Sequence, residues 1–196
     1  MSWNREYSRE LARLLVNSIG MQDFSRIVHI CHFVMQTESL EGDIVEFGCY
    51  VGDTAKLITK LTKKTVHVYD SFKGLPNDGR NAVVKEKLLE NFNRDNIRLP
   101  TIHEGWFKDL KPEDIPQKIS LAHLDGDLYS SIQESLSLVY GRMVRGGIIL
   151  VDDYKDPEWP EVTPAVDDFF ADKSDDFLWL GGINGKACTK ACVRKL

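Results

Sequence analysis

The chain has 196 residues, of which 42% are hydrophobic and 28% are charged, and these proportions exclude a disordered or fibrous protein and fit one folded domain. Its net charge of -5 disfavours a protein that binds nucleic-acid backbones, because such proteins normally present a basic face. The sequence contains no apolar run of about eighteen residues and no secretory leader, so we expect a cytoplasmic protein without a membrane partner. The 4 cysteines are too few for a disulfide scaffold, and we expect them to be reduced and buried.

Residues 1–40 are predicted to be helical, because apolar residues recur at helical spacing on both sides of Gly20. Gly20 is expected to separate two helices. We expect this part to form a helical cap or lid segment, and residues 41–196 to form the main part of what is a single domain overall. No repeat and no low-complexity linker divides the sequence.

The stretch Asp43–Thr54 joins an apolar strand to a helix through two glycines. Gly48 and Gly52 allow the backbone to curl tightly and allow a ligand to lie close to it. A helix begins directly afterwards, with Asp53 or Thr54 as its cap. A strand, a glycine turn and a helix start together form a nucleotide-sized pocket at the carboxyl end of a parallel sheet. Two glycines alone fall short of the full dinucleotide fingerprint.

The second strand, Thr65–Tyr69, is closed by Asp70. The alternation of strand, helix and strand up to this point predicts a right-handed crossover and a parallel sheet. An acid at this position, with both oxygens free to accept hydrogen bonds, is suited to bind a ribose diol. Alternatively, Asp70 only caps the turn Ser71–Pro76. Its distance from the glycine turn favours the binding role.

The pattern is weaker after this turn. Residues 77–93 are polar and compatible with a helix, and Leu99–His103 predicts a short strand. This strand leads into Trp106 and Phe107, which stand beside a glycine. The aromatic pair is suited to wall an adenine ring, since such rings stack on flat apolar surfaces. It is equally compatible with a place in the core.

Two apolar strands follow, Ile119–Leu124 and Ile148–Val151, and each is typical of a strand that is buried on both faces. A helix from Leu128 to Met143 is predicted between them, and we expect Gly146 and Gly147 to end it. The remainder of the sequence predicts one further helix and then a hairpin of two strands.

Acidic residues follow both apolar strands: Asp125 and Asp127 come after the first, and Asp152 and Asp153 after the second. Because the carboxyl ends of parallel strands form the ligand-binding edge of an open α/β sheet, we expect these carboxylates to lie near the glycine turn. Their mutual repulsion favours a bound cation, and an all-oxygen ligand set favours Mg2+, calcium or manganese over zinc. The alternative interpretation makes these acids solvated strand ends or helix caps.

The glycine turn differs from a phosphate-binding loop. The sequence lacks the pattern Gly-x-x-x-x-Gly-Lys-Ser/Thr, and Glu46, just before Gly48, would repel phosphates. The turn therefore suits a cofactor with an amino group and a ribose in place of a triphosphate. S-adenosylmethionine has both groups.

Six segments together resemble the macrocin-type sugar O-methyltransferases, a branch of the metal-dependent class I methyltransferases. They occur in the family's order: Val45–Thr54, Tyr69–Pro76, Glu104–Phe107, His123–Tyr129, Gly146–Tyr154 and Ala165–Phe169. The resemblance implies an α/β, Rossmann-like class I methyltransferase fold, in which a seven-stranded, mostly parallel sheet has an antiparallel last strand and helices on both faces. It also implies S-adenosylmethionine as the methyl donor and Mg2+ as a cofactor.

The resemblance also gives roles to individual residues. It implies that Asp125, Asp152 and Asp153 hold the metal. Asp127 is the candidate base that removes the proton of the acceptor hydroxyl, with His123 and Tyr129 as alternatives, and Asp125 is expected to take part in catalysis beside Asp127. His123 is expected to pack within its strand. The residues expected to bind the cofactor are Glu46, Gly48, Cys49, Tyr50, Gly52, Thr54, Asp70, Ser71, Phe72, Trp106, Phe107 and Asp125.

The expected acceptor is a hydroxyl of a sugar or of a glycosylated small molecule. A catechol or another phenol is an alternative acceptor, because it also presents two adjacent oxygens to the ion. A non-catalytic S-adenosylmethionine-binding subunit is a further alternative. Related enzymes usually carry a longer N-terminal segment that helps to cover the acceptor, so we expect either a more open site or a homo-oligomer, most simply a dimer, whose subunits complete each other's sites.

Overall fold

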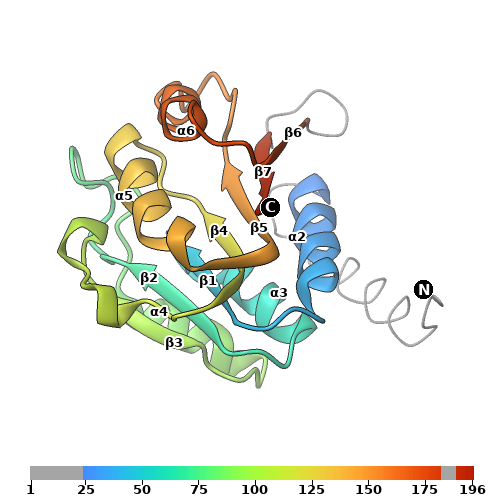
Figure 1. Ribbon diagram of the computed structural model, residues 1–196. Coiled ribbons are helices and arrows are strands. Elements are labelled where there is room, and N and C mark those ends of the chain that lie inside the picture. Colours follow the sequence, from blue (N-terminus) through green and yellow to red (C-terminus); the bar gives the residue numbers. More distant parts are fainter. Residues whose placement is uncertain (1–23, 182–188) are drawn as a thin grey trace.

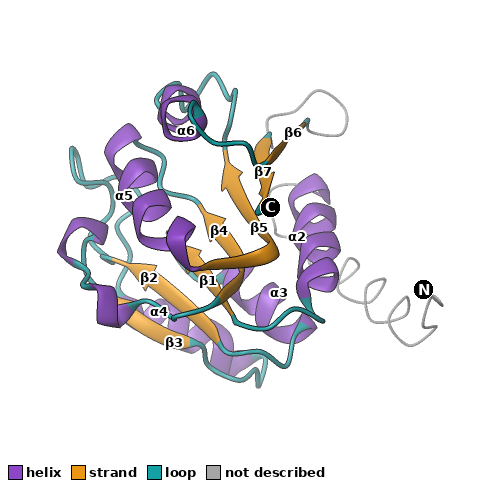
Figure 2. Cartoon of the chain, viewed as in Figure 1, coloured by secondary structure: helices purple, strands orange, loops and turns teal. Residues whose placement is uncertain are grey.

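The computed structural model describes residues 24–181 and 189–196 (Figure 1). The helix expected before Gly20 and most of the turn of the C-terminal hairpin lie outside the described residues. Within them, one sheet is covered by helices on both faces (Figure 2). This is the α/β architecture expected from the sequence.

The strands of the described residues form one seven-stranded sheet in the order β3-β2-β1-β4-β5-β7-β6. Strands β1 to β5 pair in parallel, whereas β7 runs antiparallel to both β5 and β6. The antiparallel last strand is confirmed. The strands are β1 Asp43–Phe47, β2 Val66–Asp70, β3 Thr101–Glu104, β4 Ile119–Leu124, β5 Met143–Asp152, β6 Asp176–Leu180 and β7 Lys190–Arg194.

Helices α2, α3 and α4 cover one face of the sheet, and α5 and α6 cover the other. The two layers have separate apolar clusters, one on each side of the strands. The helices are α2 Phe24–Thr37, α3 Asp53–Leu61, α4 Lys85–Arg94, α5 Tyr129–Val139 and α6 Val162–Phe170, and short 3-10 turns lie at Phe107–Asp109, Pro112–Asp114 and Tyr140–Arg142.

Strand β1 contributes to both layers of the core. Ile44 packs with residues of α2, α3 and α4, whereas Val45 and Phe47 pack with residues of α5 and α6. Successive side chains of a strand point to opposite faces, so a strand buried on both faces must be apolar at most positions. The cysteines of the described residues are free and buried, as expected: Cys31, Cys49 and Cys192.

The carboxyl ends of the central strands are held together by hydrogen bonds that continue beyond the strands. The backbone N–H of Gly48 donates to the carbonyl of Tyr69 at 2.9 Å, and that of Asp125 donates to the carbonyl of Phe47 at 2.8 Å. Strands β1 and β4 are neighbours although β2 and β3 lie between them in the sequence, so the strand order reverses here. Open α/β sheets bind ligands at such a point.

The helix expected over residues 77–93 is shorter than predicted. Helix α4 begins only at Lys85, and the preceding residues form turns. Asp78 accepts the N–H of Arg80 at 2.9 Å, and Asn81 has a left-handed φ of 62°. Short polar side chains that bond the nearby backbone compete with helix formation, which explains why helix-compatible residues form a loop here.

The helix expected from Leu128 to Met143 also ends earlier than predicted. Helix α5 ends at Val139, one 3-10 turn follows, and Met143 already begins β5. Gly146 and Gly147 therefore do not end the helix but lie inside β5, where the pairing with β4 shifts its register. Glycines are typical of such irregular places in a strand.

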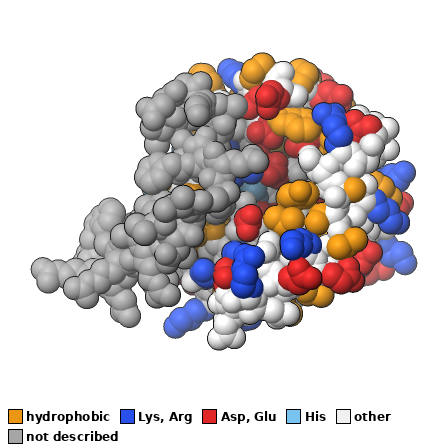
Figure 3. Space-filling model, turned by 180° about the vertical axis from the view of Figure 1, so that it is seen from behind, with side chains coloured by type: hydrophobic (Ala, Val, Ile, Leu, Met, Phe, Trp, Pro, Cys, Tyr) orange, Lys and Arg blue, Asp and Glu red, His pale blue; other side chains and the backbone are white. Residues whose placement is uncertain are grey.

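None of the helices within residues 24–181 and 189–196 is long and apolar enough to cross a membrane. On the face seen in Figure 3, Lys and Arg side chains are interspersed with acidic and hydrophobic ones. This distribution agrees with the net charge of -5.

Candidate active site

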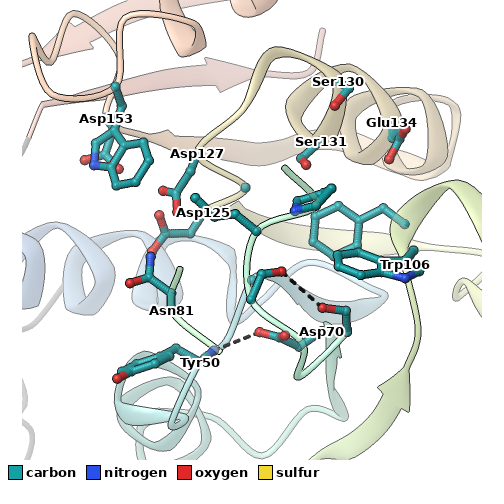
Figure 4. A pocket seen from close by; sticks show the side chains of 18 of the residues that line it. Tyr50, Asp70, Asn81, Trp106, Asp125, Asp127, Ser130, Ser131, Glu134 and Asp153 are labelled. Atoms are coloured by element: carbon teal, nitrogen blue, oxygen red, sulfur yellow. Dashed lines mark hydrogen bonds between the residues drawn. The ribbon is translucent and has the colours of Figure 1, made fainter. Parts of the chain in front are cut away.

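A cleft of about 770 Å³ opens along the carboxyl ends of the central strands. Its two ends differ in chemistry (Figure 4). Trp106 and Glu134 lie at one end, and Asp125, Asp127 and Asp153 lie at the other. A cleft of this volume holds a ligand of nucleoside size together with a second small molecule.

The turn after β1 forms part of the cleft wall. Gly48 has a φ of 83°, which is a left-handed conformation that glycine adopts freely. A Cβ atom at this position would overlap the backbone carbonyl oxygen of Asp125. Any side chain here would push the ends of β1 and β4 apart, so the close packing of the two strands requires this glycine.

Asp70, at the end of β2, fixes the glycine turn. One of its oxygens accepts the N–H groups of Cys49 and Tyr50, both at 2.9 Å, and the other accepts the N–H of Phe72 at 2.7 Å. The expectation that both oxygens are free was therefore wrong. A carboxylate has about four acceptor positions, so roughly one remains for a ligand hydroxyl. Because Asp70 also lines the cleft, its role in the turn is compatible with binding a ribose.

Trp106 and Phe107 follow β3, and both line the cleft. The ring of Phe107 also meets the ring of Phe47 edge to face, with 5.1 Å between the centroids. Figure 4 shows Trp106 and Glu134 at the end of the cleft away from Asp125, Asp127 and Asp153. The two roles considered for the aromatic pair, cleft wall and core, are thus combined in Phe107.

At the acidic end, Asp125, Asp127 and Asp153 each offer a carboxylate oxygen, and the three oxygens lie within 4.8 Å of one another. Burial, together with the neighbouring carboxylates, raises the pKa of Asp127 to about 7 and that of Asp153 to about 8. The pKa of Asp125 is also raised, chiefly by burial. Ionised carboxylates this close repel each other, so a proton or a cation stabilises them. We call these three residues the acidic cluster.

The acidic cluster fits a hard divalent cation. All of its donors are carboxylate oxygens, which Mg2+ prefers over nitrogen or sulfur. Their oxygens all lie within 4.8 Å of one another, which is close enough for a single ion to contact more than one of them. Asp127 and Asp153 also have left-handed φ values of 63° and 60°, and backbone of this kind is concentrated at functional sites.

Asp152 has a different environment. It is 1% exposed and does not line the cleft. Lys190 and His123 contact its Oδ1, His123 at 3.1 Å, and Arg26 contacts its Oδ2 at 2.9 Å. Burial alone would raise the pKa of this carboxyl, but Arg26, Lys190 and His123 outweigh it and hold the pKa well below its usual range. Two sets of residues in the described part of the chain could hold a metal ion. One set contains Asp125 and Asp152, the other contains Asp125 and Asp153, and neither contains both Asp152 and Asp153.

Glu46 and His123 form a buried pair behind the cleft. Glu46 is 1% exposed, and its Oε1 lies 3.0 Å from Nδ1 of His123. Burial disfavours a charged imidazole, but the carboxylates of Asp152 and Glu46 outweigh it and raise the pKa of His123 to about 9. His123 packs within β4, as expected. A direct contact between Glu46 and a cofactor stays a prediction.

The other residues expected to bind the cofactor fall into two groups. Tyr50 and Ser71 line the cleft beside Gly48 and Asp70. Four residues lie outside the lining: Cys49, Gly52, Thr54 and Phe72. Asp70 accepts the backbone N–H groups of Cys49 and Phe72, and a role of these two residues in cofactor binding stays a prediction.

Two loops whose residues were given no binding role from the sequence also line the cleft. One contains residues 74–81, and the other contains residues 156–159. The loops meet where the guanidinium of Arg80 lies over the ring of Trp159, 5.5 Å from its centroid. The polar turn residues of the first loop were a usable signal, but they were taken for part of a helix.

Arg26 and Lys190 are further functional candidates that the sequence did not indicate. Arg26 lies on α2 and Lys190 on β7, and both contact Asp152. Arg26 also lies 3.5 Å from Oδ2 of Asp125. Residues so distant in the sequence are brought to one carboxylate only by the tertiary fold, so no local pattern marks them.

The family model of the macrocin O-methyltransferases matches residues 3–176 of this chain. The demethyldecarbamoylnovobiocin O-methyltransferase of Streptomyces niveus is 29% identical in an alignment over 169 residues, and the match covers 72% of this chain and 64% of that enzyme. The 8-demethyl-8-(2,3-dimethoxy-alpha-L-rhamnosyl)-tetracenomycin-C 4'-O-methyltransferase of Streptomyces olivaceus is 28% identical in an alignment over 165 residues, and the match covers 69% of this chain and 61% of that enzyme. The chain therefore spans less than two thirds of the length of these two relatives.

Among solved structures, that of the O-methyltransferase NovP matches with a TM-score of 0.76 and 26% sequence identity. The match covers 88% of this chain and 80% of that one. The sheet order and the antiparallel last strand are those of the class I methyltransferase fold. The family match extends over most of the chain, and the chain therefore belongs to the macrocin O-methyltransferase family.

Proposed function

We propose that this protein is an S-adenosylmethionine-dependent O-methyltransferase that methylates a hydroxyl of a sugar or glycosylated small molecule with the help of Mg2+. The observation that carries the proposal is a single cleft that has Trp106 at one end and three carboxylates at the other, with Gly48 in its lining. A two-substrate reaction needs such a pair of unlike sites. Membership of the macrocin O-methyltransferase family supports the class of reaction.

The aromatic end suits the methyl donor. Trp106 and Phe107 offer flat apolar surface for an adenine ring, and Asp70 retains roughly one acceptor position for a ribose hydroxyl. Gly48 lets the backbone approach the ligand closely. The carboxylates at the other end attract the positive sulfonium and so favour a donor whose methyl group points toward them.

The acidic cluster suits the acceptor. We propose that Asp125 and Asp153 hold the divalent cation there. When bound, the ion would polarise the acceptor oxygen and lower the pKa of its hydroxyl. The family resemblance implies Asp152 as a further ligand, but in this chain its carboxylate is paired with three cationic groups.

Asp127 is the proposed general base. Its carboxylate lies within the acidic cluster, so a hydroxyl placed there is within its reach. A pKa of about 7 in the protein alone suits a group that accepts a proton near neutral pH. As the acceptor oxygen bonds to the methyl carbon, the carbon–sulfur bond breaks and its electron pair stays on sulfur. The sulfonium becomes a neutral thioether, and the hydroxyl proton passes to Asp127.

The proposed acceptor class rests on the relatives and on the cleft. The Streptomyces olivaceus relative is named for a rhamnosyl compound. Trp159 and Glu158 line the cleft of this chain. An aromatic ring packs against the apolar face of a sugar, and a carboxylate accepts hydrogen bonds from its hydroxyls.

The proposal is tested with the full chain, methyl-labelled S-adenosylmethionine, Mg2+ and a panel of diol-bearing glycosides and catechols. We expect label on a sugar hydroxyl, and we expect Asp127→Asn to lower kcat about 10²–10⁴-fold with S-adenosylhomocysteine binding unchanged. Asp168→Asn is the matched control, because Asp168 does not line the cleft. Its carboxylate accepts a hydrogen bond from the hydroxyl of Tyr129. Label on catechols alone would contradict the acceptor class, and donor binding without turnover on any acceptor would contradict the enzyme.

A further inference from the structure

Asp152 stands at the carboxyl end of β5, but its charge is already compensated within the protein. Lys190 contacts its Oδ1, and Arg26 contacts its Oδ2 at 2.9 Å. His123 lies 3.1 Å from Oδ1 and has its own second partner in Glu46. These contacts come from α2, β4 and β7, so three separate elements supply positive or proton-donating groups to one carboxylate.

The pair of Asp152 and Lys190 is fixed by the sheet itself. Strands β5 and β7 run antiparallel, and their register places Asp152 directly opposite Lys190. The two residues are 1% and 0% exposed, so the ammonium group of Lys190 has no route to water. A buried charge needs a partner, and removing the carboxylate from the pair would leave the ammonium uncompensated.

Asp125 and Asp153 differ from Asp152 in their access to the cleft, although Arg26 also lies 3.5 Å from Oδ2 of Asp125. Both line the cleft, where a ligand can reach them, and their oxygens belong to the acidic cluster. An oxygen of Asp153 lies within 4.8 Å of oxygens of Asp125 and Asp127, so three carboxylates that repel one another when ionised meet at this point. A divalent ion would relieve this repulsion, whereas at Asp152 it would meet the positive charges of Lys190 and Arg26.

We propose that Lys190 and Arg26 keep Asp152 out of the metal's ligand set, so that Asp125 and Asp153 are the carboxylates that hold the divalent cation. Two carboxylates are sufficient for Mg2+, which usually keeps several positions for water or substrate oxygens. Asp152 is then a positioning residue that joins β7 to β5 and orients His123. This inference rests on the metal requirement in the proposed function, and it departs from the ligand set that the family resemblance implies.

The experiment measures binding of Mn2+ to the full chain, with the free ion followed by its electron paramagnetic resonance signal. Three proteins are compared: wild type, Asp153→Asn, and a double variant with Asp152→Asn and Lys190→Met. The double variant removes both members of the buried pair, so neither a buried ammonium nor a buried carboxylate is left without its partner, and Arg26 and His123 keep Asp125 and Glu46 as partners. Thermal unfolding confirms that each protein is folded.

We expect Asp153→Asn to weaken Mn2+ binding about tenfold or more, and the double variant to stay within about threefold of wild type. A double variant that loses Mn2+ as completely as Asp153→Asn overturns the inference. If wild type binds Mn2+ and only the double variant fails, the proposed function stands and this inference alone falls. If wild type binds no Mn2+, the metal requirement and the inference fall together, while label transfer from the donor still tests the methyltransferase reaction separately.

Two single variants of Lys190 test the inference without altering any carboxylate. Lys190→Met removes the fixed cation, so the Asp152 charge becomes available near Asp125, and we expect Mn2+ to bind several-fold more tightly. Lys190→Arg keeps the cation, and we expect affinity close to that of wild type. Unchanged or weaker binding in Lys190→Met would show that Lys190 does not restrict Asp152, and it would overturn the inference.

Discussion

Asp152 and Asp153 are adjacent in the sequence and have opposite electrostatic environments. Asp152 is enclosed by Lys190, Arg26 and His123, and its pKa is lowered well below the usual range. Asp153 lines the cleft among other carboxylates, and its pKa is raised to about 8. The two residues share a strand end, so position in the sheet does not decide their roles. The charges that the rest of the fold brings to each carboxylate decide them.

The largest expected difference between the two acids is in stability. Asp152→Ala leaves the buried Lys190 without its partner, and we expect the free energy of unfolding to fall by about 3–5 kcal/mol. Asp153→Ala removes a carboxyl group whose ionised form is disfavoured in the folded protein, so we expect little loss or a small gain. Urea unfolding of the two variants beside wild type measures both effects. Equal destabilisation by the two substitutions would remove the distinction between the two residues.

The two acids are also expected to act on stability with opposite dependence on pH. Between its unfolded pKa, near 3.8, and its folded pKa of about 8, Asp153 holds a proton in the folded state and releases it on unfolding. The free energy of unfolding therefore falls as pH rises through this window, and Asp127 adds to the fall up to about pH 7. Asp152, with its lowered pKa, contributes stability above about pH 3.8 that is lost as the pH falls.

Urea unfolding at a series of pH values separates these contributions. We expect the free energy of unfolding of wild type to decline between about pH 5 and pH 8, and Asp153→Asn to decline less steeply. Mg2+ is expected to flatten the wild-type decline, because the ion stabilises the ionised carboxylates. A decline in Asp153→Asn as steep as that of wild type would contradict the raised pKa of this residue.

The smallest expected effect is that of removing the whole buried pair. A variant with Asp152→Asn and Lys190→Met has neither a stranded ammonium nor a stranded carboxylate, and we expect its free energy of unfolding to lie within about 1 kcal/mol of wild type. Comparison with Asp152→Ala in the same urea series isolates the cost of breaking the pair. A loss as large as that of Asp152→Ala would mean that the pair is not the source of the destabilisation.

Much of the fold was accessible from the sequence because local patterns determine it. The apolar runs at β1, β4 and β5 predict buried strands, and the acids that follow them predict the ligand-binding edge. The loop over residues 77–84 was not predicted, because its composition is compatible with a helix. In the structure, Asp78 accepts a hydrogen bond from the backbone of Arg80 and Asn81 has a left-handed backbone, and neither feature continues a helix. That loop belongs to the cleft, where functional geometry often overrides local preference.

The only part of the candidate site that could be predicted from the sequence is the part formed by residues at the ends of strands. Asp125, Asp127 and Asp153 were found because each follows an apolar strand. The different environments of Asp152 and Asp153 could not be predicted, because they depend on contacts of Asp152 with Lys190 on β7 and Arg26 on α2, which are distant in the sequence. Glu46 was predicted to bind the cofactor because it precedes the glycine turn. Its burial beside His123 could not be predicted, because it results from the pairing of β1 with β4.

Methyl transfer in the presence and absence of a chelator tests the central claim most directly. The full chain is incubated with methyl-labelled S-adenosylmethionine and a diol-bearing glycoside, first with Mg2+, then with excess EDTA, and finally with Mg2+ restored. We predict that label enters the sugar with Mg2+, stops entering with EDTA, and enters again when Mg2+ is restored, because the acidic cluster needs the ion to bind and activate the acceptor hydroxyl. Undiminished label transfer in excess EDTA would contradict the role given to the acidic cluster.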